Sequence, residues 1–139
     1  MKEILLDANV LISFLTDRNK DQQDRANALF LAAEKREISL FLHSITVSES
    51  IYVLRNVYGL DSKEIAGALH EALCLPGVVP VGDVPWSQVF ERWPGVISNF
   101  GDAVLAAVAI RERFDAVATF DVPLRKKLVK QGSKVYWTD

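Results

Sequence analysis

Short apolar runs alternate with longer stretches of helical periodicity along this chain of 139 residues. Such alternation is typical of β-α-β units built around a mostly parallel sheet. The sequence therefore predicts an α/β fold in which helices flank a short central sheet. The predicted strands comprise residues 3–6, 39–43, 77–81, 116–119 and 134–136.

The helices expected between these strands differ in how their apolar residues are distributed. Residues 26–33 and 65–73 carry apolar side chains at three- and four-residue spacing, which is typical of helices that bury one face. Residues 103–110 are apolar on every side and include four alanines. We expect this segment to be the best-buried helix, packed against the centre of the sheet. A helix of about two turns is expected at residues 86–93.

Length and composition limit the number of domains and the choice of partner. The chain is 50% hydrophobic and long enough for the core of one ordinary domain, so residues 1–139 are predicted to form a single domain. Its 16 Lys and Arg against 18 Asp and Glu give a net charge of −2, which excludes a strongly basic nucleic-acid-binding coat. The single cysteine, Cys74, cannot form an intramolecular disulfide and is expected to be a small core residue in a reducing compartment.

Neither a secretory signal nor a membrane span is expected. The apolar run at the N-terminus ends at Asp7, which is too early for the hydrophobic part of a signal peptide. The longest apolar run, residues 103–110, falls well below the roughly 18 residues that suggest a membrane span. A soluble, cytoplasmic protein with no membrane partner is therefore expected.

Four acidic residues are placed where predicted strands end or helices begin. Asp7 follows the first strand, and Asp121 lies two residues beyond the strand that ends at Thr119. Glu49 and Asp102 lie near the starts of two helices. Because the carboxyl ends of parallel strands meet at one edge of a sheet, all four acids can face one crevice. Each acid also fits a simpler role as a helix cap or a capping-box partner.

Carboxylates gathered in one crevice repel one another unless a cation neutralises them. Carboxylate oxygens without a nearby His or Cys suit Mg²⁺ or Mn²⁺ better than zinc. His43 and His70 have no partner at metal-ligand spacing and are expected to be structural or solvent-facing. Because Mg²⁺ usually takes waters and substrate phosphates as its remaining ligands, the acids point to chemistry on a phosphate ester.

Four short motifs that carry these acids resemble the motifs of PIN-domain ribonucleases, the family of VapC-type toxins in toxin–antitoxin pairs. They follow one another in the family's order and span nearly the whole chain. The motifs are Asp7-Ala8-Asn9-Val10-Leu11, Glu49 within residues 48–54, Asp102-Ala103 at the head of the apolar helix, and Thr119-Phe120-Asp121. The resemblance implies a single PIN-like nuclease domain.

The resemblance also implies an enzyme, a Mg²⁺- or Mn²⁺-dependent endoribonuclease that hydrolyses phosphodiester bonds of single-stranded or loop RNA. Asn9 and Thr119 would orient a carboxylate or a bound water, although a turn residue and a plain strand residue explain them as well. A cognate antitoxin protein and a homodimer are implied too. The catalytic residues, which would hold one or two ions, are Asp7, Glu49, Asp102 and Asp121.

Basic and aromatic residues supply candidates for RNA contacts. The segment after Asp121 has no acid among residues 122–138, so its basic side chains are candidates for RNA phosphate contacts or simply form a solvated face. Trp86, Phe90 and Trp93 share helical spacing and are expected to pack in the core or between subunits rather than to bind bases. The basic candidates are Arg125, Lys126, Lys127, Lys130 and, further on, Lys134.

Two other classes of protein remain as alternatives. An aspartate after the first strand also fits an aspartate-dependent phosphatase, but that pattern requires a second Asp where Asn9 stands and leaves Glu49 without a role. A PIN-like RNA-processing or non-catalytic RNA-binding module, outside a toxin–antitoxin pair, would keep the same acids. RNA cleavage that depends on a divalent ion would distinguish the nuclease from this module.

Overall fold

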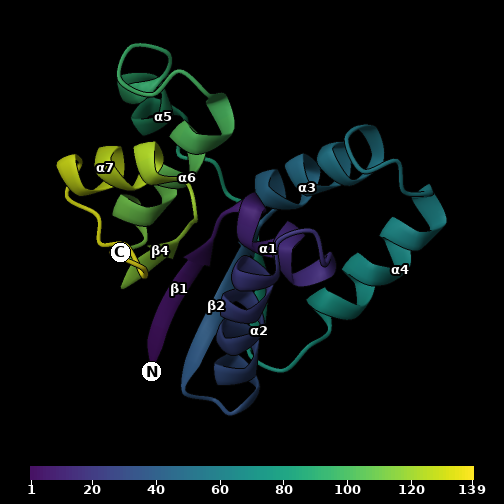
Figure 1. Ribbon diagram of the computed structural model, residues 1–139. Helices are drawn as coiled ribbons and strands as arrows, with labels where there is room; N and C mark the ends of the chain where they lie inside the picture. Colours follow the sequence, from purple (N-terminus) through teal and green to yellow (C-terminus); the bar gives the residue numbers. More distant parts are fainter.

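The computed structural model describes residues 1–139 as a parallel four-stranded sheet with helices on both faces, which confirms the expected α/β fold (Figure 1). The strand order is β3-β2-β1-β4. The strands are β1 (Lys2–Leu6), β2 (Ile38–His43), β3 (Val78–Val81) and β4 (Ala116–Ala118). The helices are α1 (Ala8–Leu15), α2 (Lys20–Glu34), α3 (Ser44–Asn56), α4 (Ser62–Leu73), α5 (Trp86–Arg92), α6 (Phe100–Arg111) and α7 (Val122–Lys130).

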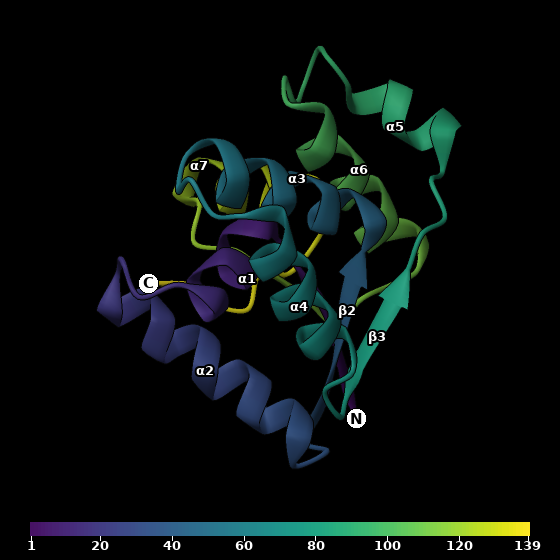
Figure 2. The ribbon, with the colours of Figure 1, turned by 90° about the vertical axis from the view of Figure 1, so that its right-hand side faces the viewer.

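Strand β1 divides the interior into two cores. It lies between β2 and β4, and Ile4, Leu5 and Leu6 are completely buried. Because successive side chains of a strand point to opposite faces, Ile4 and Leu6 belong to one core and Leu5 to the other. Helices α1 to α4 contribute to the first core, and α5 to α7 cover the second (Figures 1 and 2).

Helix α6 is the most deeply buried helix, as its sequence predicts. Every residue from Ala103 to Ala109 is buried. The helix packs in the same core as Leu5 of β1 and Val117 of β4. No helix combines the length and apolar character needed to cross a membrane.

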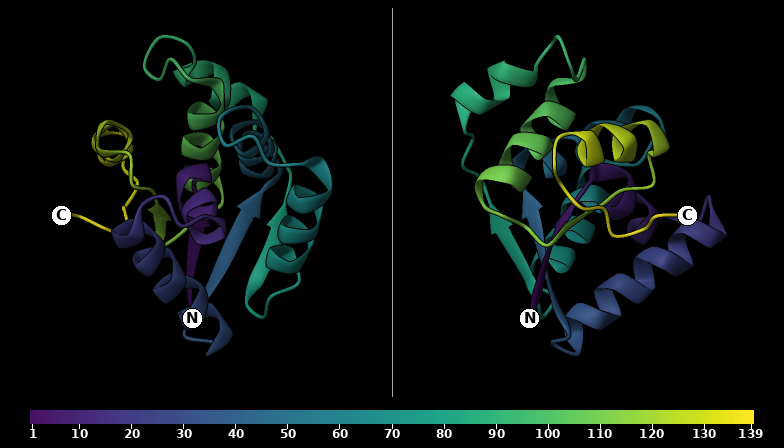
Figure 3. Two further views of the ribbon diagram at one scale, coloured as in Figure 1. Left: turned by 45° about the vertical axis from the view of Figure 1, so that its right-hand side comes forward. Right: turned by 90° about the vertical axis from the view of Figure 1, so that its left-hand side faces the viewer.

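Two sequence-based expectations are wrong. The predicted strand at residues 134–136 forms only one bridge, between Val117 and Val135, because β4 is three residues long and offers no further ladder. Residues 134–139, here called the tail segment, instead run past β4 toward α2 (Figure 3). Cys74 is exposed, because it is the C-cap of α4 and lies beyond that helix's buried stripe.

Candidate active site

The four acids predicted from the sequence lie around one cleft at the carboxyl edge of the sheet. The cleft has a volume of about 380 Å³. Asp7 and Asp121 reach it from the ends of β1 and β4, and Glu49 and Asp102 reach it from α3 and α6. A larger cavity of about 500 Å³, lined mainly by β2, the loop after β3 and α6, contains none of these acids.

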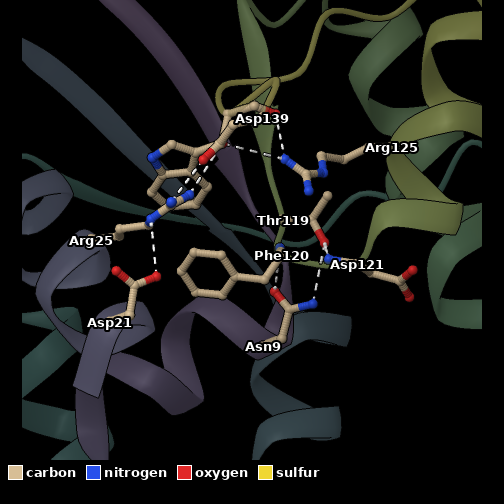
Figure 4. A network of polar contacts seen from close by, with 9 residues as sticks. Asn9, Asp21, Arg25, Thr119, Phe120, Asp121, Arg125 and Asp139 are labelled. Atoms are coloured by element: carbon tan, nitrogen blue, oxygen red, sulfur yellow. Dashed lines mark hydrogen bonds and ion pairs between the residues drawn. The ribbon is translucent and has the colours of Figure 1, made fainter. Parts of the chain in front are cut away.

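Asp7 is held in place by hydrogen bonds from two segments that are far apart in the sequence. Its side chain caps α1, where Oδ1 accepts the backbone N–H of Ala8 at 2.8 Å. Oδ2 accepts the hydroxyl of Thr119 at 2.7 Å, and that hydroxyl oxygen in turn accepts Nδ2–H of Asn9 at 3.2 Å and the backbone N–H of Asp121 at 3.1 Å. One fully buried hydroxyl therefore joins the ends of β1 and β4, as Figure 4 shows for Asn9, Thr119 and Asp121.

Asp121 combines a structural role with its place in the cleft. It is the N-cap of α7, and its Oδ1 accepts the backbone N–H of Leu124 at 3.1 Å. The cap uses only one carboxylate oxygen. The helix-cap explanation therefore holds for Asp7 and Asp121, and it does not prevent either residue from also binding a ligand.

Glu49 is positioned by the packing of α3 and by the missing side chain at Gly101. The Thr46 hydroxyl donates to the carbonyl of Leu6 at 3.1 Å, which fixes this face of α3 against β1. The buried Ser50 hydroxyl donates within the helix, to the carbonyl of Thr46 at 2.8 Å. The Glu49 carboxyl then lies against Gly101 of α6, where a Cβ atom would overlap Oε1. Only glycine leaves room for this carboxyl group.

The helices of Glu49 and Asp102 are capped by other residues. Asn99 caps α6, and its side chain accepts the backbone N–H of Asp102 at 3.0 Å. His43, which is buried, caps α3. The carboxylates of Glu49 and Asp102 are not used as caps. No hydrogen bond is among the causes that shift the pKa of either carboxyl group. Two half-buried carboxylates are thus available for an external cation.

Burial and mutual repulsion raise the pKa values of three of the four carboxyl groups. Burial, followed by the charges of Asp7 and Asp102, raises the pKa of Glu49 to about 7. Burial, followed by the charges of Asp7 and Asp121, raises the pKa of Asp102 to about 6, with Lys127 acting in the opposite direction. The pKa of Asp7 is raised mainly by burial, against the lowering effect of its hydrogen bonds. A cation would relieve this repulsion.

The donor atoms in the cleft suit a hard divalent cation. The acids offer oxygen only, and neither His nor Cys lines the cleft. No group of three or more His, Cys, Asp and Glu side chains is gathered closely enough to hold an ion by itself. Because Mg²⁺ usually keeps several waters and takes substrate phosphates as ligands, an open group of carboxylates fits it without a closed cage.

The raised pKa values predict how the stability of the metal-free protein depends on pH. The folded state binds protons on Glu49 and Asp102 more tightly than the unfolded state, so the free energy of unfolding should fall as pH rises from about 4 to about 7. Thermal melts in chelator between these pH values measure the fall. Glu49→Gln should flatten the dependence, and an unchanged dependence in this variant would contradict the assignment.

The basic residues predicted to contact RNA phosphates differ in their availability. Lys126 and Lys130 are exposed on α7, and Lys127 is near enough to Asp102 for its charge to lower the pKa of that carboxyl group. The side chain of Arg125 is only 12% exposed, and its guanidinium donates to the carbonyl of Trp137 at 2.9 Å. The three lysines are at least partly exposed, whereas one guanidinium nitrogen of Arg125 already donates to the backbone of the tail segment.

The aromatic residues of α5 form a stacked cluster with the start of α6. Trp93 and Phe100 pack against the second core, with ring centroids 5.3 Å apart. Trp86 and Phe90 lie on the outer side and are 55% and 59% exposed. The expected packing role therefore applies to Trp93 within this chain, while Trp86 and Phe90 remain open to a partner.

Two residues that shape the cleft were not identified from the sequence. Asn99 precedes Asp102 by three residues, a capping spacing that could have revealed it. No local pattern marks Gly101, because glycine is needed there only to leave space for the side chain of Glu49 on another helix.

The PIN-domain family model matches residues 4–127, so the chain belongs to the PIN-domain family, a family of nucleases. None of the curated proteins matches this sequence. Solved structures share the fold, among them the following three. The toxin VapC20 of Mycobacterium tuberculosis, described as cleaving the sarcin-ricin loop, is 15% identical with a TM-score of 0.69, over 88% of this chain and 93% of that one.

The other two structures come from Rickettsia felis and Pyrobaculum aerophilum. A chain of the Rickettsia felis VapBC2 complex, bound to a DNA fragment from its promoter, is 18% identical with a TM-score of 0.63, over 89% of this chain and 92% of that one. The Pyrobaculum aerophilum protein PAE2754 is 21% identical with a TM-score of 0.64, over 94% of this chain and 96% of that one. Because all three sequences are at most 21% identical to this chain, their similarity to it shows a shared fold.

Proposed function

We propose that residues 1–139 form a single nuclease domain that acts as a metal-dependent endoribonuclease on single-stranded or loop RNA. The observation that carries the proposal is the convergence of Asp7, Glu49, Asp102 and Asp121 on one cleft. Two of these carboxylates are unpaired, and their pKa values are raised by burial and mutual repulsion. Membership of a nuclease family supports a phosphodiester as the substrate of this cleft.

The four acids are the residues that would hold one or two Mg²⁺ or Mn²⁺ ions. Such an ion, when bound, supplies an activated water and neutralises negative charge on the scissile phosphate. The chain's own contribution is to fix the ligands. Thr119 and Asn9 hold Asp7 and the backbone of Asp121 in register, so these two carboxylates need little reorganisation when substrate binds.

We further propose that the protein is the toxin of a toxin–antitoxin pair in the cytoplasm. Two of its structural neighbours are a toxin and a chain of a VapBC complex, which supports this role. Its cognate antitoxin would insert a basic side chain into the acidic cleft. The cleft also has apolar walls against which the antitoxin segment that carries this side chain could pack. These walls are formed by Ile12, Val53 and Tyr58. The homodimer stays a prediction, for which the exposed Trp86 and Phe90 offer a surface.

The ribonuclease proposal is tested by incubating the protein with a mixed RNA pool in Mg²⁺, in Mn²⁺ and in chelator. Cleavage is expected with at least one ion and none in chelator, because the unneutralised carboxylates repel the phosphate. Asp7→Asn should lack the activity under every condition. Equal cleavage by all samples would indicate a contaminating nuclease and remove the support for the proposed mechanism.

A further inference from the structure

The tail segment places a carboxylate between two arginines (Figure 4). Asp139 accepts hydrogen bonds from Nη1 and Nη2 of Arg25 on α2, at 3.1 and 2.7 Å. Nη1 of Arg125 on α7 lies 3.9 Å from Oδ1 of the same carboxylate. This bidentate contact is the geometry by which the guanidinium group of arginine binds both carboxylates and phosphates.

This arginine pair adjoins the catalytic cleft. Arg125 lies one helical turn after Asp121, and its backbone N–H donates to the Asp121 carbonyl at 2.9 Å. Phe120 stacks on Trp137 of the tail segment with ring centroids 4.6 Å apart, and its backbone N–H donates to Oδ1 of Asn9 at 3.1 Å. Neither arginine lines the cleft itself, but each lies about one helical turn beyond a residue that does, Gln22 on α2 or Asp121 before α7. An RNA strand that left the cleft along these two helices would reach both arginines.

Asp139 is exchangeable, although it is not the only acid beside Arg25, since Oδ2 of Asp21 on α2 lies 3.4 Å from Nε of that arginine. The Asp139 side chain is 61% exposed, so its ion pairs are screened by water and salt and are readily replaced by another anion. No other acid occurs in residues 122–139. The basic side chains of that stretch are Arg125, Lys126, Lys127, Lys130 and Lys134.

We propose that Arg25 and Arg125 form a subsite for a backbone phosphate of single-stranded RNA, and that Asp139 occupies this subsite until RNA displaces it. The inference rests on the proposed ribonuclease function and adds a substrate contact and an internal competitor to it. Arg25 then contributes most to RNA affinity when Asp139 has lost its charge. A structural clamp would instead affect only the stability of the fold.

Binding of a fluorescent single-stranded RNA, followed by anisotropy in an Asp102→Asn background without divalent ions, separates these roles. Asp139→Asn is expected to tighten binding about threefold at low salt, because the phosphate no longer has to displace an exposed ion pair, and such pairs contribute less than about fivefold to an equilibrium. Adding Arg25→Ala should reverse the gain and lower the slope of log K against log[salt] by about 0.7. Lys35→Ala, which removes an exposed charge at the other end of α2, should change neither quantity.

Two negative results have different meanings. RNA binding that is the same in all variants, together with lower melting temperatures for Arg25→Ala and Asp139→Asn, would overturn the subsite and leave a clamp on the tail segment. Absence of RNA binding in every variant and at every salt concentration would overturn the ribonuclease proposal itself, and the subsite with it.

Discussion

Replacing Asp102 by asparagine is expected to lower the rate of RNA cleavage by at least about 100-fold and to raise the melting temperature measured in chelator. Loss of a partner that only orients a metal ligand already costs about 10-fold to 100-fold in affinity or activity, and Asp102 lies in the cleft itself with a free carboxylate. The neutral amide also ends the repulsion from Asp7 and Asp121. Because the site is half exposed, solvent screens part of this repulsion. We therefore expect the free energy of unfolding to rise by on the order of 1 kcal/mol and the melting temperature by about 4 °C.

Both effects of Asp102→Asn are measured on one preparation, by single-turnover cleavage with the divalent ion and by a thermal melt in chelator. Asp61→Asn is the matched control, because Asp61 caps α4 at an exposed position and asparagine caps a helix equally well. The control should change neither quantity. Cleavage close to that of the unmodified protein would remove Asp102 from the catalytic set, and a lower melting temperature would contradict the repulsion argument.

Gly101→Ala is expected to reduce cleavage by about 100-fold without unfolding the protein. A Cβ atom at this position would overlap Oε1 of Glu49, which is the far end of a flexible side chain and can swing away. The fold should therefore survive, whereas Glu49 leaves its place in the cleft. A misplacement of about 1 Å in a catalytic group can cost about 100-fold in rate.

Gly67→Ala is the matched control for Gly101→Ala. Gly67 lies in α4, is exposed, and has open space where a Cβ atom would be. Alanine in that helix should raise stability by up to about 1 kcal/mol and leave cleavage unchanged. Equal activity of the two alanine variants in a cleavage assay would show that Glu49 does not need the space at Gly101.

Local patterns were sufficient to predict most of the fold. The buried strands and the apolar helix α6 were predicted because their side-chain periodicity reflects the faces that they bury. The same reasoning predicted the position of the four acids at the carboxyl edge of the sheet. It failed for Cys74 and for residues 134–136, because exposure at a helix end and the length of a partner strand are set by neighbouring elements.

The sequence by itself determined the α/β class, the parallel sheet and the residue types gathered for phosphodiester chemistry, since each of these follows from short-range periodicity and strand ends. Only the tertiary structure showed that Glu49 and Asp102 lack partners, that Gly101 makes room for Glu49, and that Asp139 lies on Arg25. These features join segments far apart in the chain. No local pattern encodes such contacts, because their geometry depends on how the helices pack around the sheet.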